Sequence, residues 1–379
     1  MARRRRIAAV TGSRADYGHL RPVLAALARR GGVDLHVVVT GMHLQAAYGA
    51  TAREVERDGW AIREVPVAAA ADSLPAVARS IGAGVVAMVD AFEALDPDIV
   101  VVLGDRFEVL AAALAATYSG RLLAHIHGGD RSQGGYDEYT RHAVTKLAHL
   151  HFAATRTSAA RIRRLGEDPA RIVTVGAPGL DDLVAGIPYG ADICTRHGVK
   201  PGGYLLVAFH PVSTDPGQAG REMRAVLHGA ADAGLPVIGI FPNSDPGTRA
   251  TLAELRQARH VKTHPSLPRK EYLGLLANCA ALVGNSSSGI IEAPVLGIPA
   301  VNVGPRQEGR ERGANVLDVR ADRKAVRNAI GKALNDPAFR KRVARRRHPY
   351  GDGKAGARIA AKLATVGLNA ALRRKTFHD

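Results

Sequence analysis

The chain has 379 residues, 46% hydrophobic but only 4% aromatic, so it can bury two or three domain cores built from Ala, Val, Leu and Ile. Its two cysteines exclude a disulfide scaffold, and since no compact ligand spacing is present we expect no metal site. No apolar run reaches the length of a membrane span and no signal-peptide pattern is present. We therefore expect a cytoplasmic protein without a membrane partner.

The net charge of +17 raises nucleic acid as a partner. Much of the positive excess lies in three clusters, at Arg3–Arg6, Lys341–Arg347 and Arg373–Lys375. Aromatic residues do not alternate with these cations, as they do on surfaces that stack bases. An arginine-rich surface that attracts an anionic substrate explains the charge equally well. We therefore expect no nucleic-acid partner.

The first half of the chain alternates short apolar strands with alanine-rich helices. We predict helices near His19–Arg30 and at Phe107–Tyr118. The predicted strands are Arg6–Val10, Leu35–Thr40, Asp98–Leu103, Leu122–Ile126, His151–Ala154 and Ile172–Val175. Continuously apolar strands that alternate with helices are typical of a parallel sheet covered on both faces, as in doubly wound domains.

The alternation restarts after a polar stretch near Gly186–Gly203, which we interpret as an inter-domain linker. The later predicted strands are Tyr204–Phe209, Pro236–Phe241, Ala280–Val283 and Pro299–Val303. The predicted fold class is therefore α/β, with two Rossmann-like doubly wound domains at residues 1–185 and 186–354. Ligands of such domains bind at the carboxyl ends of the strands, so we expect a cleft between the domains.

The segment Ala281–Glu292 runs from an apolar strand through a Gly/Ser loop straight into a predicted helix. Free backbone N–H groups and the positive end of the helix dipole meet in such a loop, which makes it an anion site. Ser286, Ser287 and Ser288 add hydroxyl donors for a diphosphate, and Glu292, one helical turn on, can bond the hydroxyls of a ribose. The loop predicts a bound nucleotide. The alternative is a serine-rich helix cap without a ligand.

Other strand ends carry charged or histidine side chains, each with a plainer interpretation beside the functional one. Asp105 can cap the helix that follows it. Asp137 and Arg141, four residues apart, can form an ordinary surface pair. His125 and His127 alternate on one strand, so one of them can face the core. The loops concerned are Thr11–Gly18, Gly104–Glu108, His125–His142, Phe209–Asp215 and Gly304–Arg310.

In this order and spacing the motifs resemble those of the UDP-N-acetylglucosamine 2-epimerases, from roughly Ile7 to Gly356. Gly-Asp-Arg-Phe-Glu at 104–108 and His-Ile-His-Gly-Gly at 125–129 are closer to the hydrolysing branch of that family. The non-hydrolysing branch usually has Gly-Asp-Thr and His-Val-Glu-Ala-Gly. The resemblance implies the glycosyltransferase-B architecture, a helix within residues 355–379 that crosses back to the first domain, a homodimer and no cofactor.

The resemblance also implies an activity. Such an enzyme removes the C2 proton of UDP-N-acetylglucosamine and eliminates UDP, which leaves 2-acetamidoglucal. In the hydrolysing branch, addition of water then gives N-acetylmannosamine. Two alternatives remain, a non-hydrolysing epimerase that re-adds UDP to give UDP-N-acetylmannosamine and a glycosyltransferase that uses a UDP-sugar. The substrate can also be a related UDP-amino sugar, such as a diacetamido-trideoxyhexose nucleotide.

The site residues follow from the motif positions. Asp105 and Asp137 match catalytic carboxylates, the first for proton transfer at the sugar and the second for the later step, and these roles can be exchanged. His127 stands where many relatives have a catalytic glutamate, so either His127 or Asp130 is expected to carry a proton, and His210 is a further catalytic candidate. The predicted UDP site consists of Arg14, Arg106, His210, Asn243, Ser286, Ser287, Ser288, Glu292 and Arg306.

Overall fold

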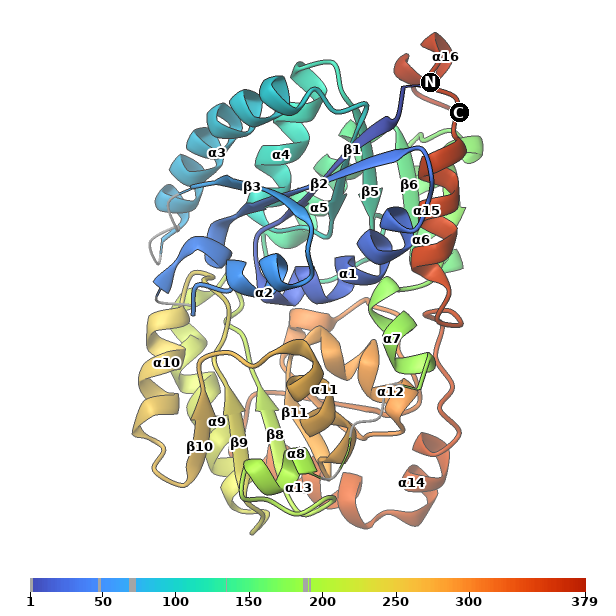
Figure 1. Cartoon of the computed structure of the whole chain (residues 1–379). Coiled ribbons are helices and arrows are strands. Elements are labelled where there is room, and N and C mark those ends of the chain that lie inside the picture. Colours follow the sequence, from blue (N-terminus) through green and yellow to red (C-terminus); the bar gives the residue numbers. More distant parts are fainter. Residues whose placement is uncertain (1–2, 47–48, 68–72, 134, 187–189, 191) are drawn as a thin grey trace.

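The computed structural model describes residues 3–46, 49–67, 73–133, 135–186, 190 and 192–379. Two parallel sheets, each flanked by helices, form two domains that lie one above the other (Figure 1). The predicted α/β class and the two facing Rossmann-like domains are therefore confirmed.

The N-terminal sheet has seven strands in the order β3-β2-β1-β4-β5-β6-β7. Its elements are β1 (Arg5–Thr11), α1 (Arg14–Ala28), β2 (Val33–Thr40), α2 (Ala52–Arg57), β3 (Ala61–Val65), α3 (Leu74–Leu95), β4 (Ile99–Leu103), α4 (Phe107–Tyr118), β5 (Leu122–Ile126), α5 (Asp137–Leu147), β6 (Leu150–Ala153), α6 (Arg156–Arg164), β7 (Ile172–Thr174) and α7 (Asp181–Val184). The inner strands β4, β5 and β6 are buried along their whole length, which is why they are continuously apolar.

The C-terminal sheet has six strands in the order β10-β9-β8-β11-β12-β13. Its elements are α8 (Asp192–Arg196), β8 (Leu205–Ala208), α9 (Ala219–Ala231), β9 (Val237–Ile240), α10 (Thr248–Gln257), β10 (Val261–His264), α11 (Arg269–Asn278), β11 (Ala281–Gly284), α12 (Glu292–Leu296), β12 (Ala300–Val303), β13 (Val316–Val319), α13 (Arg323–Asn335) and α14 (Pro337–Val343). The strand order reverses between β8 and β11, as it does between β1 and β4 in the other sheet. Ligands bind beside such reversals, so the topology places a site between the loops that follow these four strands.

The stretch predicted as a bare linker contributes to the core of the second domain. Helix α8 lies within it, and its residues Ile193 and Cys194 are buried against Tyr204 and Leu276. A helix there escaped prediction because its polar flanks and Gly/Pro neighbours dominate the composition. Residues 187–189 and 191 lie outside the described part of the chain.

After α14 the chain returns to the N-terminal domain through α15 (Ala355–Thr365) and α16 (Ala370–Arg373). Figure 1 shows α15 running beside the upper domain, close to both ends of the chain. Ile359 and Leu363 of α15 are fully buried in the same apolar cluster as Leu20 and Leu24 of α1. The N-terminal core is therefore completed by a segment from the far end of the sequence.

Helix α3 corrects the expectation that no apolar run is long enough to span a membrane. It is the one such helix in the described residues, with 22 residues and an 18-residue window of mean hydropathy 1.4, of which 22% is buried. Alanine and glycine, not large apolar side chains, supply much of its length. Met88, Ala91 and Phe92 pack in the apolar cluster that also contains residues of α4, so α3 covers one face of the N-terminal sheet.

Candidate active site

The cleft between the domains has two connected parts. The acid/base chamber is lined by residues that include Asp105, His127, Asp137, Arg141 and Arg310. The serine-loop chamber is lined by residues that include Phe241, Tyr272, His210, Ser286, Ser287, Ser288 and Glu292. Both chambers share Ser13, His19, Asn243, Ser287 and Arg306. The sequence-predicted catalytic and nucleotide-binding residues, except Asp130, thus lie around one continuous space.

Asp105 ends the loop after β4 and is held by a buried arginine of α5. Arg141 is only 1% exposed. Its Nε donates a hydrogen bond to the Asp105 carboxylate at 2.8 Å, and its Nη1 donates one to the Asp130 carbonyl oxygen at 3.1 Å. Burial raises the pKa of Asp105, but Arg141 and the more distant Arg310 outweigh that effect and leave it below its usual range. Asp105 is therefore an ionised group in the cleft.

Two plain interpretations of these residues are wrong. The N-cap position of α4 is Arg106, with no side-chain capping bond, so Asp105 does not cap that helix. Arg141 pairs with Asp105 and Glu138 instead of Asp137, and it is buried instead of lying at the surface. The partner of Arg141 lies 36 residues away in sequence, which local spacing cannot reveal. Arg141 is thus a site residue that the sequence-based list lacked.

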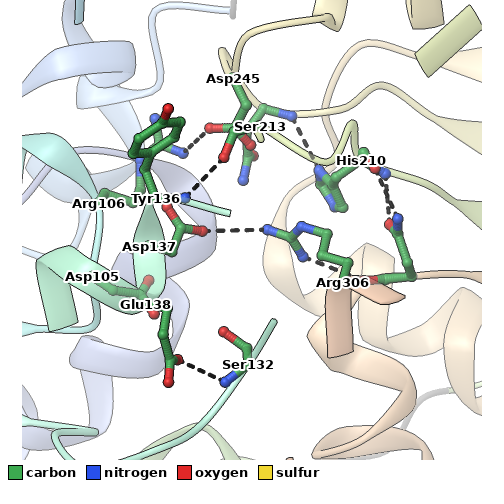
Figure 2. Close-up of polar contacts among 12 residues, drawn as sticks. Asp105, Arg106, Ser132, Tyr136, Asp137, Glu138, His210, Ser213, Asp245 and Arg306 are labelled. Atoms are coloured by element: carbon green, nitrogen blue, oxygen red, sulfur yellow. Dashed lines mark hydrogen bonds and ion pairs between the residues drawn. The ribbon is translucent and has the colours of Figure 1, made fainter. Parts of the chain in front are cut away.

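Asp137 lies at the start of α5 and faces the other domain. Its carboxylate is 3.8 Å from Nη2 of Arg306, and Figure 2 shows the two side chains meeting across the cleft near Asp105. Withdrawal from bulk water raises the pKa of Asp137 to about 7, and the carboxylates of Asp105 and Asp245 add to the rise, although 37% of the side chain is open to the cleft. Two nearby carboxylates with oppositely shifted pKa values are the arrangement of an acid and a base.

His127 lines the acid/base chamber, and Asp130 lies behind it. The His127 Nδ1 atom is 3.4 Å from the Asp130 carboxylate, which is also bonded by the Ser158 hydroxyl at 2.7 Å. Burial raises the pKa of Asp130, but His127, Arg310 and Arg141 together hold it below its usual range. Asp130 is only 2% exposed and is not among the residues that line either chamber. His127 is therefore the member of this pair that a substrate in the chamber can contact.

His210 lines the serine-loop chamber and presents a neutral imidazole. Its backbone N–H donates to Asn285 Oδ1 at 2.7 Å, and its Nδ1 accepts from the backbone N–H of Asn243 at 3.3 Å. Burial lowers the pKa of His210 strongly, with smaller contributions from Arg306 and Arg106. The ring proton then lies on Nε2, so His210 is a hydrogen-bond donor, a role that suits a phosphate oxygen.

The serine loop follows β11 as expected but does not open straight into a long helix. Ser287–Gly289 forms one 3-10 turn, in which the Ser286 hydroxyl accepts from the Ser288 N–H at 3.3 Å. The helix α12 has only five residues and begins at Glu292. The loop, with its own hydroxyls and backbone N–H groups, is therefore the feature that can receive an anion, because so short a helix has little dipole of its own.

Glu292 is a buried carboxylate with one oxygen that has no hydrogen-bond partner among the described residues. It is 1% exposed, and its Oε1 lies 3.5 Å from His19 Nε2 and 3.6 Å from Arg269 Nη1. Its Oε2 has no hydrogen-bond partner among the described residues. Burial raises the pKa of Glu292, and Arg269 offsets part of that rise. His19 and Arg269 were not predicted, because nothing in their local sequence marks them as neighbours of the serine loop.

Arg14 and Arg106 already have partners that join the two domains. Arg14 donates to Ser266 Oγ at 2.6 Å across the cleft. Arg106 donates to Ser244 Oγ at 3.2 Å and lies 3.5 Å from Asp245, as Figure 2 shows. To bind a diphosphate, either arginine has to exchange these partners for phosphate oxygens. In the described residues no group of three or more His, Cys, Asp or Glu side chains can hold a metal ion.

Two Rossmann-like domains face each other across a cleft, with the serine loop on one side and carboxylates of oppositely shifted pKa on the other. This arrangement defines the class, a two-domain α/β enzyme of glycosyltransferase-B architecture. A family model described as UDP-N-acetylglucosamine 2-epimerase matches residues 25–364. The chain belongs to the UDP-N-acetylglucosamine 2-epimerase family, as its motifs predicted.

Two curated relatives support the family, and one of them is named as a hydrolysing enzyme. A UDP-N,N'-diacetylbacillosamine 2-epimerase (hydrolyzing) of Legionella pneumophila is 39% identical over 377 residues, 98% of each chain. A UDP-N-acetylglucosamine 2-epimerase of Neisseria meningitidis serogroup B is 33% identical over 342 residues, 87% of this chain and 88% of the relative. The expected family is confirmed, and the first relative supports the expected branch.

A solved structure shares the fold. The crystal structure of UDP-GlcNAc 2-epimerase from Neisseria meningitidis bound to UDP-GlcNAc superposes with a TM-score of 0.81 at 18% identity. The match covers 94% of this chain and 99% of that one. Similarity over nearly the whole length at such low identity shows that the two-domain architecture itself is common to both.

Proposed function

We propose that the protein is a hydrolysing 2-epimerase of UDP-2-acetamido sugars. It removes the C2 proton, eliminates UDP to leave a 2-acetamidoglycal, and adds water to give UDP and the free sugar with inverted C2. The observation that carries this proposal is the position of Asp105 and Asp137. They lie on one wall of the cleft, with oppositely shifted pKa values, and face the serine loop on the other.

The first step pairs a base with a stabilised leaving group. Asp105, which stays ionised, accepts the proton from C2 as the C1–O bond to UDP breaks. Negative charge grows on the departing diphosphate, where Arg306, the His210 Nε2–H and the serine-loop donors neutralise it. In the second step water adds to C1 while C2 takes a proton, for which the raised pKa of Asp137 supplies a protonated carboxyl near neutral pH. The roles of Asp105 and Asp137 exchange if the sugar binds with its other face toward α5.

UDP-N-acetylglucosamine is the substrate that the motifs imply, with N-acetylmannosamine as the product. A second candidate substrate is UDP-N,N'-diacetylbacillosamine, because the 39% identical relative is named for it. The two sugars differ at C4 and C6, away from the C2 chemistry. The same catalytic groups therefore serve either one, and only turnover distinguishes them.

The test is proton NMR of each nucleotide sugar turning over in D₂O with purified protein and no added cofactor. Deuterium at C2 of a free 2-acetamido sugar, with UDP released, supports the proposal, and the faster substrate identifies the sugar. Deuterated UDP-N-acetylmannosamine in equilibrium with substrate would instead establish the non-hydrolysing activity. If C2 never exchanges in either sugar, the epimerase proposal fails and transfer to an acceptor from a UDP-sugar is tested next.

Expectations beyond the site extend this proposal. We propose a cytoplasmic homodimer that binds neither nucleic acid nor membrane. Light scattering coupled to size-exclusion chromatography measures the mass, which for a dimer is twice the 40.0 kDa of one chain. A mobility shift of a mixed-sequence DNA at physiological salt would contradict the absence of a nucleic-acid partner.

A further inference from the structure

The loop that carries His127 is pressed against the first turn of α6. A Cβ on Gly129 would lie 2.3 Å from the Ser158 carbonyl oxygen and 2.6 Å from Ile162 Cγ1, so only glycine allows this approach. His127 itself has a φ of +64°, an uncommon conformation for a residue other than glycine. Such backbone conformations persist only where the surroundings impose them. The fold therefore fixes the backbone position from which the His127 ring extends.

A chain of hydrogen bonds then fixes how the ring is turned. The Ser158 hydroxyl donates to one oxygen of Asp130 at 2.7 Å, and the other oxygen lies 3.4 Å from His127 Nδ1. Arg310 Nη2, 3.8 Å from the same carboxylate, keeps Asp130 ionised and therefore an acceptor. The Asp130 carboxylate accepts a hydrogen bond from the Nδ1–H group, which leaves Nε2 as the nitrogen that is free to act in the acid/base chamber.

The Ser158 hydroxyl is not needed to cap α6. Thr155 is the N-cap residue, and its hydroxyl accepts from the Ser158 N–H at 3.0 Å. The Ser158 hydroxyl is therefore available to orient Asp130. A carboxylate beside the first turn of a helix is also stabilised by the helix dipole. These contacts hold Asp130 in one orientation and in its ionised form. A residue that only fills space in the core would need neither.

We infer that Asp130 and Ser158 are positioning residues that hold the proton of His127 on Nδ1, so that Nε2 accepts a proton from the water that adds to C1. The inference rests on the proposed function. As the water oxygen bonds to C1, its O–H bond breaks and the proton passes to Nε2. C2, at the other end of the C1–C2 double bond, uses the electron pair of that bond to take a proton from Asp137. The imidazolium that forms is stabilised by Asp130 until it loses its proton to solvent.

The tautomer can be measured without any substrate. Long-range ¹⁵N–¹H correlation spectra of the full chain labelled in histidine distinguish a protonated Nδ1 from a protonated Nε2. The signals of His127 are those that vanish in His127→Gln. We expect the Nδ1–H form in the wild type and its loss in Asp130→Asn. A wild-type His127 protonated on Nε2 would overturn the inference, whatever the enzyme's activity.

The second measurement separates elimination from addition of water. Asp130→Asn should lower the rate of free-sugar formation by about 10²-fold, and Ser158→Ala by about tenfold. Elimination should be retained, so the released 2-acetamidoglycal rises relative to the epimerised sugar while KM changes little. Equal loss of both steps in Asp130→Asn, with no glycal released, would contradict the assignment to water addition.

Ile162→Val is the matched control. Ile162 is fully buried against the same loop, and its apolar side chain cannot form a hydrogen bond with Ser158, Asp130 or His127. The loss of one methylene should lower the melting temperature slightly and leave both the His127 tautomer and the product ratio unchanged. A change in product ratio as large as that of Ser158→Ala would show that loop packing, not orientation of Asp130, controls the reaction.

If the wild type turns over neither UDP-sugar, the proposed function fails while the tautomer measurement still tests the positioning.

Discussion

The N-terminal wall of the cleft carries the carboxylates Asp105 and Asp137, whereas the C-terminal wall combines neutral donors with the cations Arg306 and Arg310. On the first wall, Asp105 is bonded to the buried Arg141, and Asp130 is bonded to His127. On the second wall, the serine-loop hydroxyls and the neutral His210 face the space instead. Asp105 and Asp137, whose pKa values are shifted in opposite directions, both lie on the first wall. The comparison teaches that proton transfer belongs to one wall and recognition of the leaving group to the other.

Asp137→Asn should show the largest effect that this comparison predicts. The amide keeps the shape of the side chain but cannot give a proton to C2, so kcat should fall by about 10³-fold while KM changes less than threefold. Initial rates of free-sugar formation, measured at several substrate concentrations, separate the two constants. If kcat of the variant stays within tenfold of wild type, a residue other than Asp137 donates the proton to C2.

The pH dependence of kcat should reflect the same carboxyl. Asp137 donates only while protonated, so kcat should fall about tenfold for each pH unit well above its pKa of about 7. The folded-state pKa lies above the ordinary value, so protonated Asp137 favours the folded state, and this contribution is lost as pH rises through about 7. The melting temperature of Asp137→Asn should therefore rise relative to that of the wild type as the pH increases from 6 to 8. A pH-independent difference would exclude the raised pKa.

Glu292→Gln tests the opposite wall and should act on binding. The free Oε2 of Glu292 is predicted to accept from a ribose hydroxyl, and loss of its charge should weaken UDP binding about fivefold. Isothermal titration with UDP measures the change, and kcat should stay within twofold. A large fall in kcat without a change in UDP affinity would break the division of labour between the walls.

Removal of residues 1–4 should have the smallest effect. Arg3 is 64% exposed at its side chain and pairs with the half-exposed Asp96, far from the cleft. Exposed pairs of this kind contribute little to stability, so kcat, KM and the melting temperature should be nearly those of the full chain. A strong loss of turnover in a trimmed protein that still folds would show that charges outside the two walls take part in function.

The sequence predicted the inner strands well and the edge strands poorly. Strands buried on both faces are continuously apolar, and the nine predicted inner strands are all present, as is the predicted edge strand β7. The three that were missed, β3, β10 and β13, are edge strands whose half-exposed faces carry charged or polar residues such as Arg63, Lys262 and Asp318. Such segments lack the apolar run on which the prediction depended.

The site was predicted where a strand end carried its residues and missed where distant elements supply them. Asp105, Asp137 and the serine loop follow strands or begin helices, so topology alone brings them to the cleft. Arg141 was considered only as one member of a possible surface pair with Asp137. His19 and Arg269 meet Glu292 only because α1 and α11 approach it from different domains. Contacts between domains leave no periodic or local pattern in the sequence.

The return of α15 to the first domain has a consequence for synthesis of the chain. Residues 14–28 form α1, whose apolar face is covered by residues 355–365 of α15. At roughly 5–20 residues per second, a ribosome needs on the order of 20–60 s between making the two segments. During that interval the first domain is exposed to chaperones with part of its core uncovered. The domain made first is therefore the last to be finished, and truncated translation products cannot complete it.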